Sequence, residues 1–488
     1  MTARTVAWVA FGIYLVVTTG LAIAGMRKTS DMRGFAIGNR DMGPGLVGIT
    51  LAASVASTAT FVINPGFVWR DGISALLFFG LAGGAGVITG LVVLSPGFRR
   101  LGDSNGALTL PEWLGARYDS RALRGWFSVL NLVLAVAFVV LIVKGSALVM
   151  QHTLGLSYAT SVLVVVGFVF SYILIGGTYA HAYTNALQGA LMIVVALVLF
   201  GSGLPRLVSG ELFASLHAAD PALLAPVNES SALFGSAFEV FVCGFVVSFG
   251  LVCQPHILTK ALYLRGPSDL RRYLVVAAAV GVCFSLILFV GLYARVLLGG
   301  DVAQDAVVAR YVAEAFGPVV GALIAVALLA AGMSTMDGIL VSASTIAGHD
   351  VALALLRRRI PDDDARARAG LRISRGLLVL MGVVACVIAL NPPQLVGLFA
   401  QTGVYGLVAA SMAPMTFGVL VRDVPRSAVW AASVLGPLAH FAVYFGVSGT
   451  LNPATSATAG IALSFAILGA AVAWRRRAGS ARDAATAS

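Results

Sequence analysis

Ser334, Thr335 and Asp337 lie in the middle of an apolar stretch, residues 319–349, that is long enough to span a bilayer. On a helix, Ala331, Ser334 and Thr335 fall at i, i+3 and i+4, so one face presents a carbonyl region and two hydroxyls. A cluster of neutral oxygens suits a hard cation such as sodium. Alternatively, the two hydroxyls bond back to the carbonyl one turn earlier or join two helices.

Further ionisable residues lie in or beside predicted spans. Lys144, in AFVVLIVKGSALVM, either extends its ammonium group to the membrane surface or faces the helix bundle and meets an anionic substrate. Asp337 is a candidate to hold an ion or to carry a proton. His181 follows a predicted turn at Gly176-Gly177, so we expect it at the cytoplasmic surface without a chemical role.

The composition is that of a polytopic membrane protein, because 59% of the 488 residues are hydrophobic, 11% are charged and the mean hydropathy is +0.94. Four cysteines lie singly in apolar runs, without the spacing of a disulfide or metal site. Apolar runs of spanning length predict about 13 transmembrane helices, which begin near Val6, Gly43, Ile73, Gly125, Ser157, Ala182, Ser236, Tyr273, Gly317, Ile373, Pro393, Ala428 and Ala454.

Most of the 32 Lys and Arg residues fall in alternate connecting segments. The positive-inside rule then predicts an outward N-terminus and a cytoplasmic C-terminus in a plasma membrane of the bacterial inner-membrane type. Topology thereby accounts for the net charge of +11. We therefore expect the lipid bilayer, and no nucleic acid, as the large partner.

Two predicted spans are interrupted at mid-membrane depth. The second span has AASVASTAT at its centre and Pro65-Gly66 beyond it, and the seventh carries Gly250 and Pro255. Freed carbonyls are tolerated where they face a cavity or an ion, although a small-residue packing face would also explain the second span. The two spans open blocks of five helices each, which is typical of an inverted-repeat transporter.

One polytopic domain is predicted over residues 1–478. Its repeats cover about 43–205 and 236–420, with peripheral helices 1, 12 and 13, and a short cytoplasmic tail follows at 479–488.

Four segments resemble the sodium:solute symporter family: ASVASTATFVINPG, IGGTYAHAYTNALQG, QPHILTKALYLRGPSDLRR and ALLAAGMSTMDGILVSAST. The resemblance implies an all-α, LeuT-like fold with a five-plus-five inverted repeat, alternating access and sodium-driven uptake, and no enzymatic activity. It also implies a sodium site made of two carbonyls in the broken second helix and three oxygens of the ninth, here Ala53, Ala56, Ala331, Ser334 and Thr335.

The resemblance further implies a substrate cavity beside the two breaks, formed by Ser57, Thr60, Phe61, Phe249, Gly250 and Gln401, to which Lys144 adds its charge. The chain departs from the family at Asn185, where many members carry an aspartate that looks like part of a second sodium site. Asn185 and Asp337 are therefore candidates for a second ion site or a proton site.

We predict a symporter that uses Na⁺ as its coupling ion and imports a small organic solute. The solute is an organic anion such as a monocarboxylate or pantothenate, because Lys144 offers charge, or an amino acid such as proline. A proton-coupled symporter that uses Asp337 is the alternative. The triplet Asp362, Asp363 and Asp364 would fit a membrane-embedded prenyltransferase-type enzyme, but arginines on both sides favour a solvated charge cluster.

Overall fold

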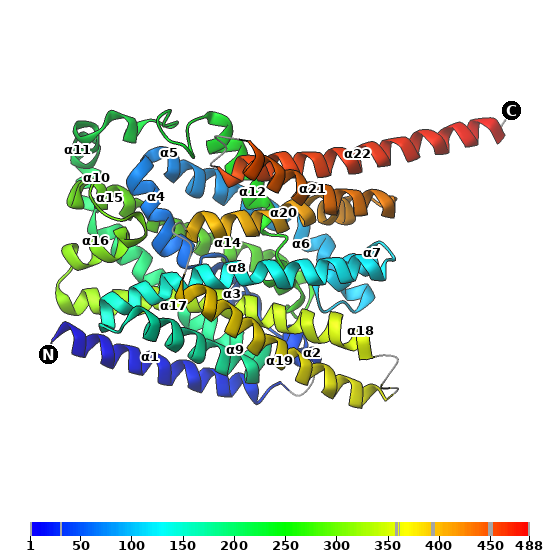
Figure 1. Cartoon of the computed structure of the whole chain (residues 1–488), viewed down its shortest axis with the longest axis horizontal. Helices are drawn as coiled ribbons and strands as arrows, with labels where there is room; N and C mark the ends of the chain where they lie inside the picture. The colour runs from blue at the N-terminus through cyan, green and yellow to red at the C-terminus, as the bar shows by residue number, and fades with distance from the viewer. Residues whose placement is uncertain are drawn as a thin grey trace.

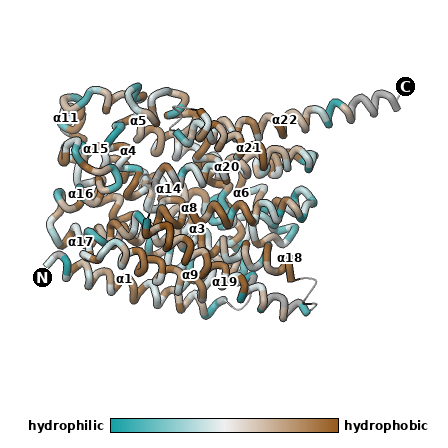
Figure 2. Tube along the Cα trace, in the orientation of Figure 1, coloured by the Kyte–Doolittle hydropathy of each residue, from teal (hydrophilic) through white to brown (hydrophobic). Residues whose placement is uncertain are grey.

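The computed structural model describes residues 2–29, 32–356, 360, 362–391, 396–447 and 452–486. These residues form helices and, apart from one isolated bridge between Met42 and Leu264, no β-structure. The long helices lie side by side along the longest axis of the molecule (Figure 1), and apolar residues occupy most of their length (Figure 2).

The long apolar helices are α1 (Ala3–Met26), α6 (Gly83–Asn105), α8 (Arg121–Leu154), α9 (Tyr158–Ser202), α14 (Leu270–Ser285) with α15 (Phe289–Leu298), α17 (Pro318–Thr345), α19 (Asp363–Leu390), α20 (Val396–Leu420), α21 (Arg426–Gly446) and α22 (Pro453–Thr486). Shorter helices join them, among them α2 (Met32–Ile37), α7 (Leu110–Arg117), α11 (Glu211–Ala219), α16 (Val307–Ala315) and α18 (Leu353–Leu356). In the described part of the chain, ten helices are long and apolar enough to cross a membrane, or twelve if each of two bent pairs counts as one span. The thirteenth predicted span stays a prediction, because Tyr158–Leu174 is a shorter apolar helix.

The second span is broken where the sequence places small polar residues. Helix α3 (Pro44–Val55) meets the π-helical segment η2 (Ala59–Ile63) and the following helix α4 (Asn64–Asp71) at an angle of 56°. At the break Ala56 leaves the helical region, with ψ at 90°, and the Ser57 hydroxyl accepts a hydrogen bond from the Ala59 N–H at 3.0 Å. A side chain that competes for backbone groups in this way ends a helix.

The seventh span is broken in the same manner. The helices over Phe238–Leu251 and Pro255–Leu262 meet at 67°. Gln254 is extended, with ψ at 143°, which is the conformation that a following proline favours. The prediction of two broken spans is therefore confirmed.

Helix α9 contains the predicted turn between the fifth and sixth spans. Helical hydrogen bonding continues across it, but Gly177 has φ 57° and ψ −148°, a conformation that only glycine adopts readily. A Cβ at this position would also lie 2.5 Å from the Phe35 ring. The chain reverses here, since Gly176 lies beside α1 whereas Ser202 at the end of α9 bonds to Tyr311 of α16.

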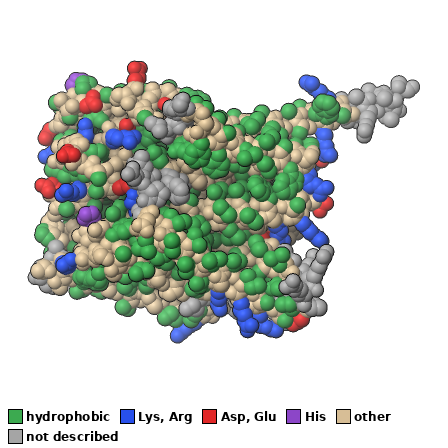
Figure 3. Space-filling view, viewed as in Figure 1, with side chains coloured by type: hydrophobic (Ala, Val, Ile, Leu, Met, Phe, Trp, Pro, Cys, Tyr) green, Lys and Arg blue, Asp and Glu red, His purple; other side chains and the backbone are tan. Residues whose placement is uncertain are grey.

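Helix α17 occupies the centre of the molecule, and between Ile324 and Thr345 every residue except Ser342 is buried. On the face shown in Figure 3, Lys and Arg side chains line the end of the molecule that holds α7 and α18. We call this the α7 end and the opposite one the α16 end. The prediction that the α7 end faces the cytoplasm stays a prediction.

Candidate functional site

Five oxygens converge where α17 passes the break of the second span. The Ser334 hydroxyl lies 2.9 Å from the Ala53 carbonyl oxygen and 2.8 Å from that of Ala331. The Thr335 hydroxyl lies 3.1 Å from the Ser54 carbonyl oxygen and 3.4 Å from that of Ala53. Each hydroxyl has one proton and can donate to only one of its two neighbours at a time, so acceptor lone pairs remain in the cluster.

This oxygen cluster fits a sodium ion by the chemistry of its donors, because it offers neutral carbonyl and hydroxyl oxygens that are all buried. Ala53, Ala331, Ser334 and Thr335, all predicted from the sequence, lie together in it. The fifth predicted ligand, Ala56, makes no described hydrogen bond with either hydroxyl, lines a cavity beside the break and stays a prediction. The Ser54 carbonyl, which was not predicted, also lies in the cluster.

Helix α8 packs closely against the same break and against α17, and a glycine lies at each of the two contacts. A Cβ at Gly145 would lie 2.2 Å from the Thr58 methyl group, and one at Gly332 of α17 would lie 2.3 Å from Ser146 Oγ and 2.6 Å from Thr58 Oγ1. The hydroxyls of Thr58 and Ser146 are buried and have no hydrogen-bond partner among the described residues. They are unused polar groups beside the break; Thr58 belongs to the segment AASVASTAT on which the predicted break rests, whereas Ser146 was not predicted.

Asp337 lies one half-turn beyond the oxygen cluster and is fully buried. Its carboxylate accepts hydrogen bonds from the Tyr172 hydroxyl and, at 3.0 Å, from the Thr184 hydroxyl, both on α9. Asn185 donates to the Ser54 hydroxyl at 3.0 Å. Asn185 therefore contacts a residue of the oxygen cluster and Asp337 contacts α9, and no described hydrogen bond joins the two candidates for a second ion or proton site.

Next to them lies a buried pair that sequence reasoning missed. The Lys260 ammonium nitrogen lies 2.6 Å from His181 Nε2, and both side chains are fully buried. The expectation that His181 lies at the surface is wrong, because the reversal at Gly177 carries the following turn of α9 into the core. An ammonium group without contact to water needs such a partner.

The seven residues predicted to bind the substrate do not line any one of the described cavities together. Thr60 lines a cavity of about 210 Å³ between α3, α6, α12 (Gly244–Leu251) and α14, and none of the other six is described as lining it. Phe61 packs edge-on against Phe284, and Gly250 faces Val408 of α20. The other four lie on different elements: Ser57 is in the break itself, Lys144 on α8, Phe249 on α12 and Gln401 on α20.

Lys144 already has an anionic partner. Its ammonium nitrogen lies 3.3 Å from Asp305 Oδ2 in the segment that precedes α16, and both side chains are mostly buried. The ammonium thus points toward the α16 end, while the neighbouring Gly145 and Ser146 pack at the level of the break.

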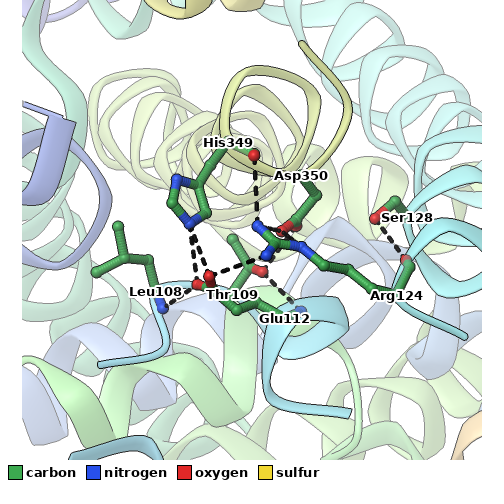
Figure 4. Close-up of polar contacts among 7 residues, drawn as sticks. All are labelled: Leu108, Thr109, Glu112, Arg124, Ser128, His349 and Asp350. Carbon is green, nitrogen blue, oxygen red and sulfur yellow. Dashed lines mark hydrogen bonds and ion pairs between the residues drawn. The ribbon is translucent and has the colours of Figure 1, made fainter. Parts of the chain in front are cut away.

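A second charged cluster lies at the α7 end (Figure 4). Arg124 of α8 forms ion pairs with Glu112 of α7 at 3.1 Å and with the buried Asp350 of η10 (Ile346–Ala352), which follows α17, at 2.6 Å. His349 Nε2 lies 2.9 and 3.0 Å from the two Glu112 oxygens. Burial would raise the pKa of Glu112, but the hydrogen bond and charge of His349 and the charge of Arg124 together lower it.

Ligand atoms of Glu112, His349 and Asp350 lie within 4.8 Å of one another, close enough to hold a metal ion. The guanidinium of Arg124 contacts both carboxylates, however, and supplies the positive charge that a metal would bring. The arrangement is that of an ion-pair cluster that joins α7, α8 and the end of α17.

Residues 35–436 match the family model described as the sodium:solute symporter family. A sodium/pantothenate symporter of Escherichia coli (strain K12) is 26% identical over 453 residues, which are 90% of this chain and 89% of that protein. A sodium/proline symporter of the same organism is 26% identical over 457 residues, which are 90% and 88% of the two chains. The solved structure of a Na⁺-coupled sialic acid symporter is similar with a TM-score of 0.77 at 16% identity, covering 95% of this chain and 96% of that one.

Two broken spans, of which the second meets α17 at a buried cluster of oxygens, are typical of a membrane transporter of the inverted-repeat class. Because the family match covers most of its length, the chain belongs to the sodium:solute symporter family. The predicted family, the all-α LeuT-like fold and the predicted class of function are confirmed.

Proposed function

We propose that the oxygen cluster of Ala53, Ser54, Ala331, Ser334 and Thr335, with the Ala56 carbonyl at the break as a further ligand, binds the Na⁺ ion that drives import of a small organic solute. The observation that carries this proposal is the contact of the Ser334 and Thr335 hydroxyls with the carbonyls of the broken second span. An ion at that position would hold α17 and the break together. It would thereby favour one of the two states between which the protein alternates, and a solute with the same preference would bind more tightly.

The solute class rests on Lys144. We propose a small organic anion, a monocarboxylate or pantothenate, because this ammonium lies one residue before the close contact of α8 with the break. Proline is the second candidate, since relatives that carry pantothenate or proline are equally similar to this chain. The hydroxyls of Thr58 and Ser146 join Ser57, Thr60, Phe61, Phe249, Gly250 and Gln401 as proposed contacts.

We also propose the orientation of the protein in the membrane and the movement that transports the solute. The N-terminus lies outside and the C-terminus in the cytoplasm of the plasma membrane, and the two repeats, about 43–205 and 236–420, move against each other. We propose no enzymatic reaction. Asp362 is exposed, and the side chains of Asp363 and Asp364 lie outside the described residues, so the structure adds nothing to the prenyltransferase reading.

Uptake into proteoliposomes tests the function. Purified protein is reconstituted, and [¹⁴C]pantothenate, [¹⁴C]proline and a labelled monocarboxylate are added with an inward Na⁺ gradient, with an inward proton gradient in Na⁺-free buffer, or with neither. Accumulation that requires the Na⁺ gradient supports the proposal. Accumulation under a proton gradient alone would replace it with proton-coupled transport, for which Asp337 is the candidate carrier.

A further inference from the structure

The cavity beside the break of the second span is a narrow groove between α6 and α14. Its volume is about 210 Å³, and α3, the break and α12 form its floor. On the α6 side its lining extends from Gly80 to Leu91, and on the α14 side from Ala277 to Leu288. Both stretches cover 11 residue steps, so the groove is about 16 Å long and runs parallel to the two helices. We call it the α6–α14 groove.

The α6–α14 groove opens onto the apolar outer surface of the protein. Ile88 on the α6 side and Val282 on the α14 side line it, and both side chains are exposed although both belong to membrane-spanning stretches. Leu81 and Val92, on the same face as Ile88, are exposed as well. Exposed apolar side chains of a spanning helix face lipid, so the groove is continuous with the lipid-facing surface.

Two glycines leave the groove open. A Cβ at Gly84 or at Gly281, both of which line the groove, would meet nothing within 4 Å. An apolar cavity of about 150 Å³ is large enough to bind benzene, so the groove has room for part of a hydrocarbon chain. A larger side chain at either glycine would occupy this space without displacing a neighbour.

Asn64 adds a polar group near the α16 end of the groove. It begins α4, lines the groove, and its side-chain amide makes no hydrogen bond with any described residue. Asp71 at the other end of α4 is seven residues further on, so Asn64 lies about 10 Å inside the end of the span. An unpaired amide in contact with hydrocarbon is unfavourable, and a hydrogen-bond acceptor at this level would remove that penalty.

The dimensions and the lining of the groove indicate the kind of occupant. The hydrocarbon core of a bilayer is about 30 Å thick, so a groove of about 16 Å matches the depth of one leaflet. The residues described as lining it include no Asp, Glu, Lys, Arg or His, so the groove does not suit the organic anion proposed as the solute. Of the residues proposed to bind Na⁺ or the solute, only Ala56 and Thr60 are described as lining it.

From this lipid-facing groove and its unpaired amide we infer that the protein binds one phospholipid of the leaflet at the α16 end. One acyl chain of this lipid lies in the α6–α14 groove, and Asn64 donates a hydrogen bond to its ester carbonyl. The chain then packs against Val55 and Ala56 at the break of the second span, so the break can move only if the chain moves with it. The inference is independent of which ion and which solute the protein carries.

Photocrosslinking of the full-length protein tests the position of the chain. The protein is reconstituted into vesicles of phosphatidylethanolamine and phosphatidylglycerol that contain a small fraction of a phosphatidylcholine with a diazirine near the end of one acyl chain. After irradiation, modified residues are identified by mass spectrometry of peptides. We expect adducts at Leu51 and Leu91, which line the groove and are buried, as well as at the exposed Val16 of α1. Lipid that only surrounds the protein would modify Val16 and not the buried pair.

Gly84→Leu and Gly281→Leu fill the groove. In each variant the adducts at Leu51 and Leu91 should fall about tenfold relative to those at Val16, a change that corresponds to about 1.4 kcal/mol of binding free energy. Gly167→Leu, at an exposed position of α9 where a Cβ also meets nothing within 4 Å, is the matched control and should keep the adducts. Should one of the two variants fail to fold, the other gives the result.

Asn64→Leu tests the hydrogen bond to the lipid. Native mass spectrometry of the detergent-solubilised protein counts the phospholipids that stay bound, and we expect one fewer in this variant. Ser285→Ala is the control, because Ser285 lines the same groove but its hydroxyl already donates to the Val282 carbonyl at 2.7 Å.

Three results would overturn the inference. They are the absence of adducts at Leu51 and Leu91 in the unmodified protein, adducts that persist in the filled variants, and an unchanged lipid count in Asn64→Leu. Adducts that disappear when millimolar pantothenate or proline is added would also overturn it, because the groove would then hold the solute. Loss of Na⁺-driven uptake would contradict the proposed function and would leave these measurements unaffected.

Discussion

Lys144 and Asp305 form an ion pair, with 3.3 Å between Nζ and Oδ2, that ties α8 to the segment between α15 and α16. The same segment is tied to α4, the half of the broken second span that lies toward the α16 end, since Arg70 donates to the Gln304 side chain at 3.1 Å. Trp69 also donates to the Gly299 carbonyl at 2.9 Å. A solute anion that binds Lys144 must therefore compete with Asp305.

Asp305→Asn is expected to lower the half-saturating concentration of an anionic solute about three- to tenfold. The substitution removes a competing carboxylate, and a partly exposed ion pair is worth about 1 kcal/mol, which corresponds to about fivefold in affinity. The measurement is the concentration dependence of Na⁺-driven uptake in proteoliposomes. Asp301→Asn, in the same segment and exposed, is the control. An unchanged half-saturating concentration would separate Lys144 from the solute.

Ser334→Ala and Thr335→Ala are each expected to raise the Na⁺ concentration for half-maximal uptake about thirtyfold. Each substitution removes one hydroxyl from the oxygen cluster, and a ligand oxygen is worth about 2 kcal/mol. Ser344→Ala on the same helix should leave the Na⁺ dependence unchanged, because that hydroxyl bonds to the Val341 carbonyl of its own helix. A Na⁺ dependence unaltered in the first two variants would count against the site.

The sequence predicts a structural feature where a residue type at a given position has a single structural consequence. Hydroxyls at helical spacing in an apolar stretch located Ser334 and Thr335, and Pro255 located the second break, because a proline cannot continue a helix without losing a hydrogen bond. The particular carbonyls of the second span that approach these hydroxyls could not be predicted in this way. Every residue has a carbonyl, so which carbonyls approach the two hydroxyls depends on the dihedral angles of the break, and the contact of the Ser54 carbonyl was not predicted.

Contacts between charged or polar residues that are distant in the sequence could not be predicted either. The turn at Gly176-Gly177 predicts a surface position for His181, and nothing in the sequence indicates Lys260 as its partner. The two lie 79 positions apart, and only the packing of α9 against the seventh span brings them together in the core. The Lys144–Asp305 pair, 161 positions apart, was hidden for the same reason.

Gly145→Ala is expected to impair Na⁺-driven uptake and to destabilise the protein by about 1 to 3 kcal/mol. The added Cβ would lie 2.2 Å from the Thr58 methyl group and push the break away from α8. Gly125→Ala on the same helix meets nothing within 4 Å and serves as the matched control. Thermal unfolding in detergent and uptake are measured for both. Equal behaviour of the two variants would mean that the break does not depend on this close approach.

Arg124→Gln is expected to destabilise the protein by about 2 kcal/mol, a figure below that for fully buried pairs because Arg124 is partly exposed. The substitution leaves the buried Asp350 carboxylate with the Thr109 hydroxyl as its described partner. Arg121→Gln, exposed on the same helix, is the control in thermal unfolding. Adding Asp350→Asn should recover part of the loss. No recovery would show that Arg124 acts through packing rather than through charge.

Because the pKa of Glu112 is lowered, we expect the thermal stability of the protein to depend on pH through this residue at the α7 end. Burial opposes its ionisation, but His349 and Arg124 together lower the pKa of its carboxyl below the ordinary value of 4.5. A lowered folded-state pKa contributes stability above the unfolded-state value, and this contribution is lost as the pH falls through the folded-state pKa. The midpoint of thermal unfolding should therefore fall more steeply below about pH 4.5 in the unmodified protein than in Glu112→Gln. The exposed Glu314→Gln should follow the unmodified protein, and parallel curves for all three would exclude Glu112 as the group responsible.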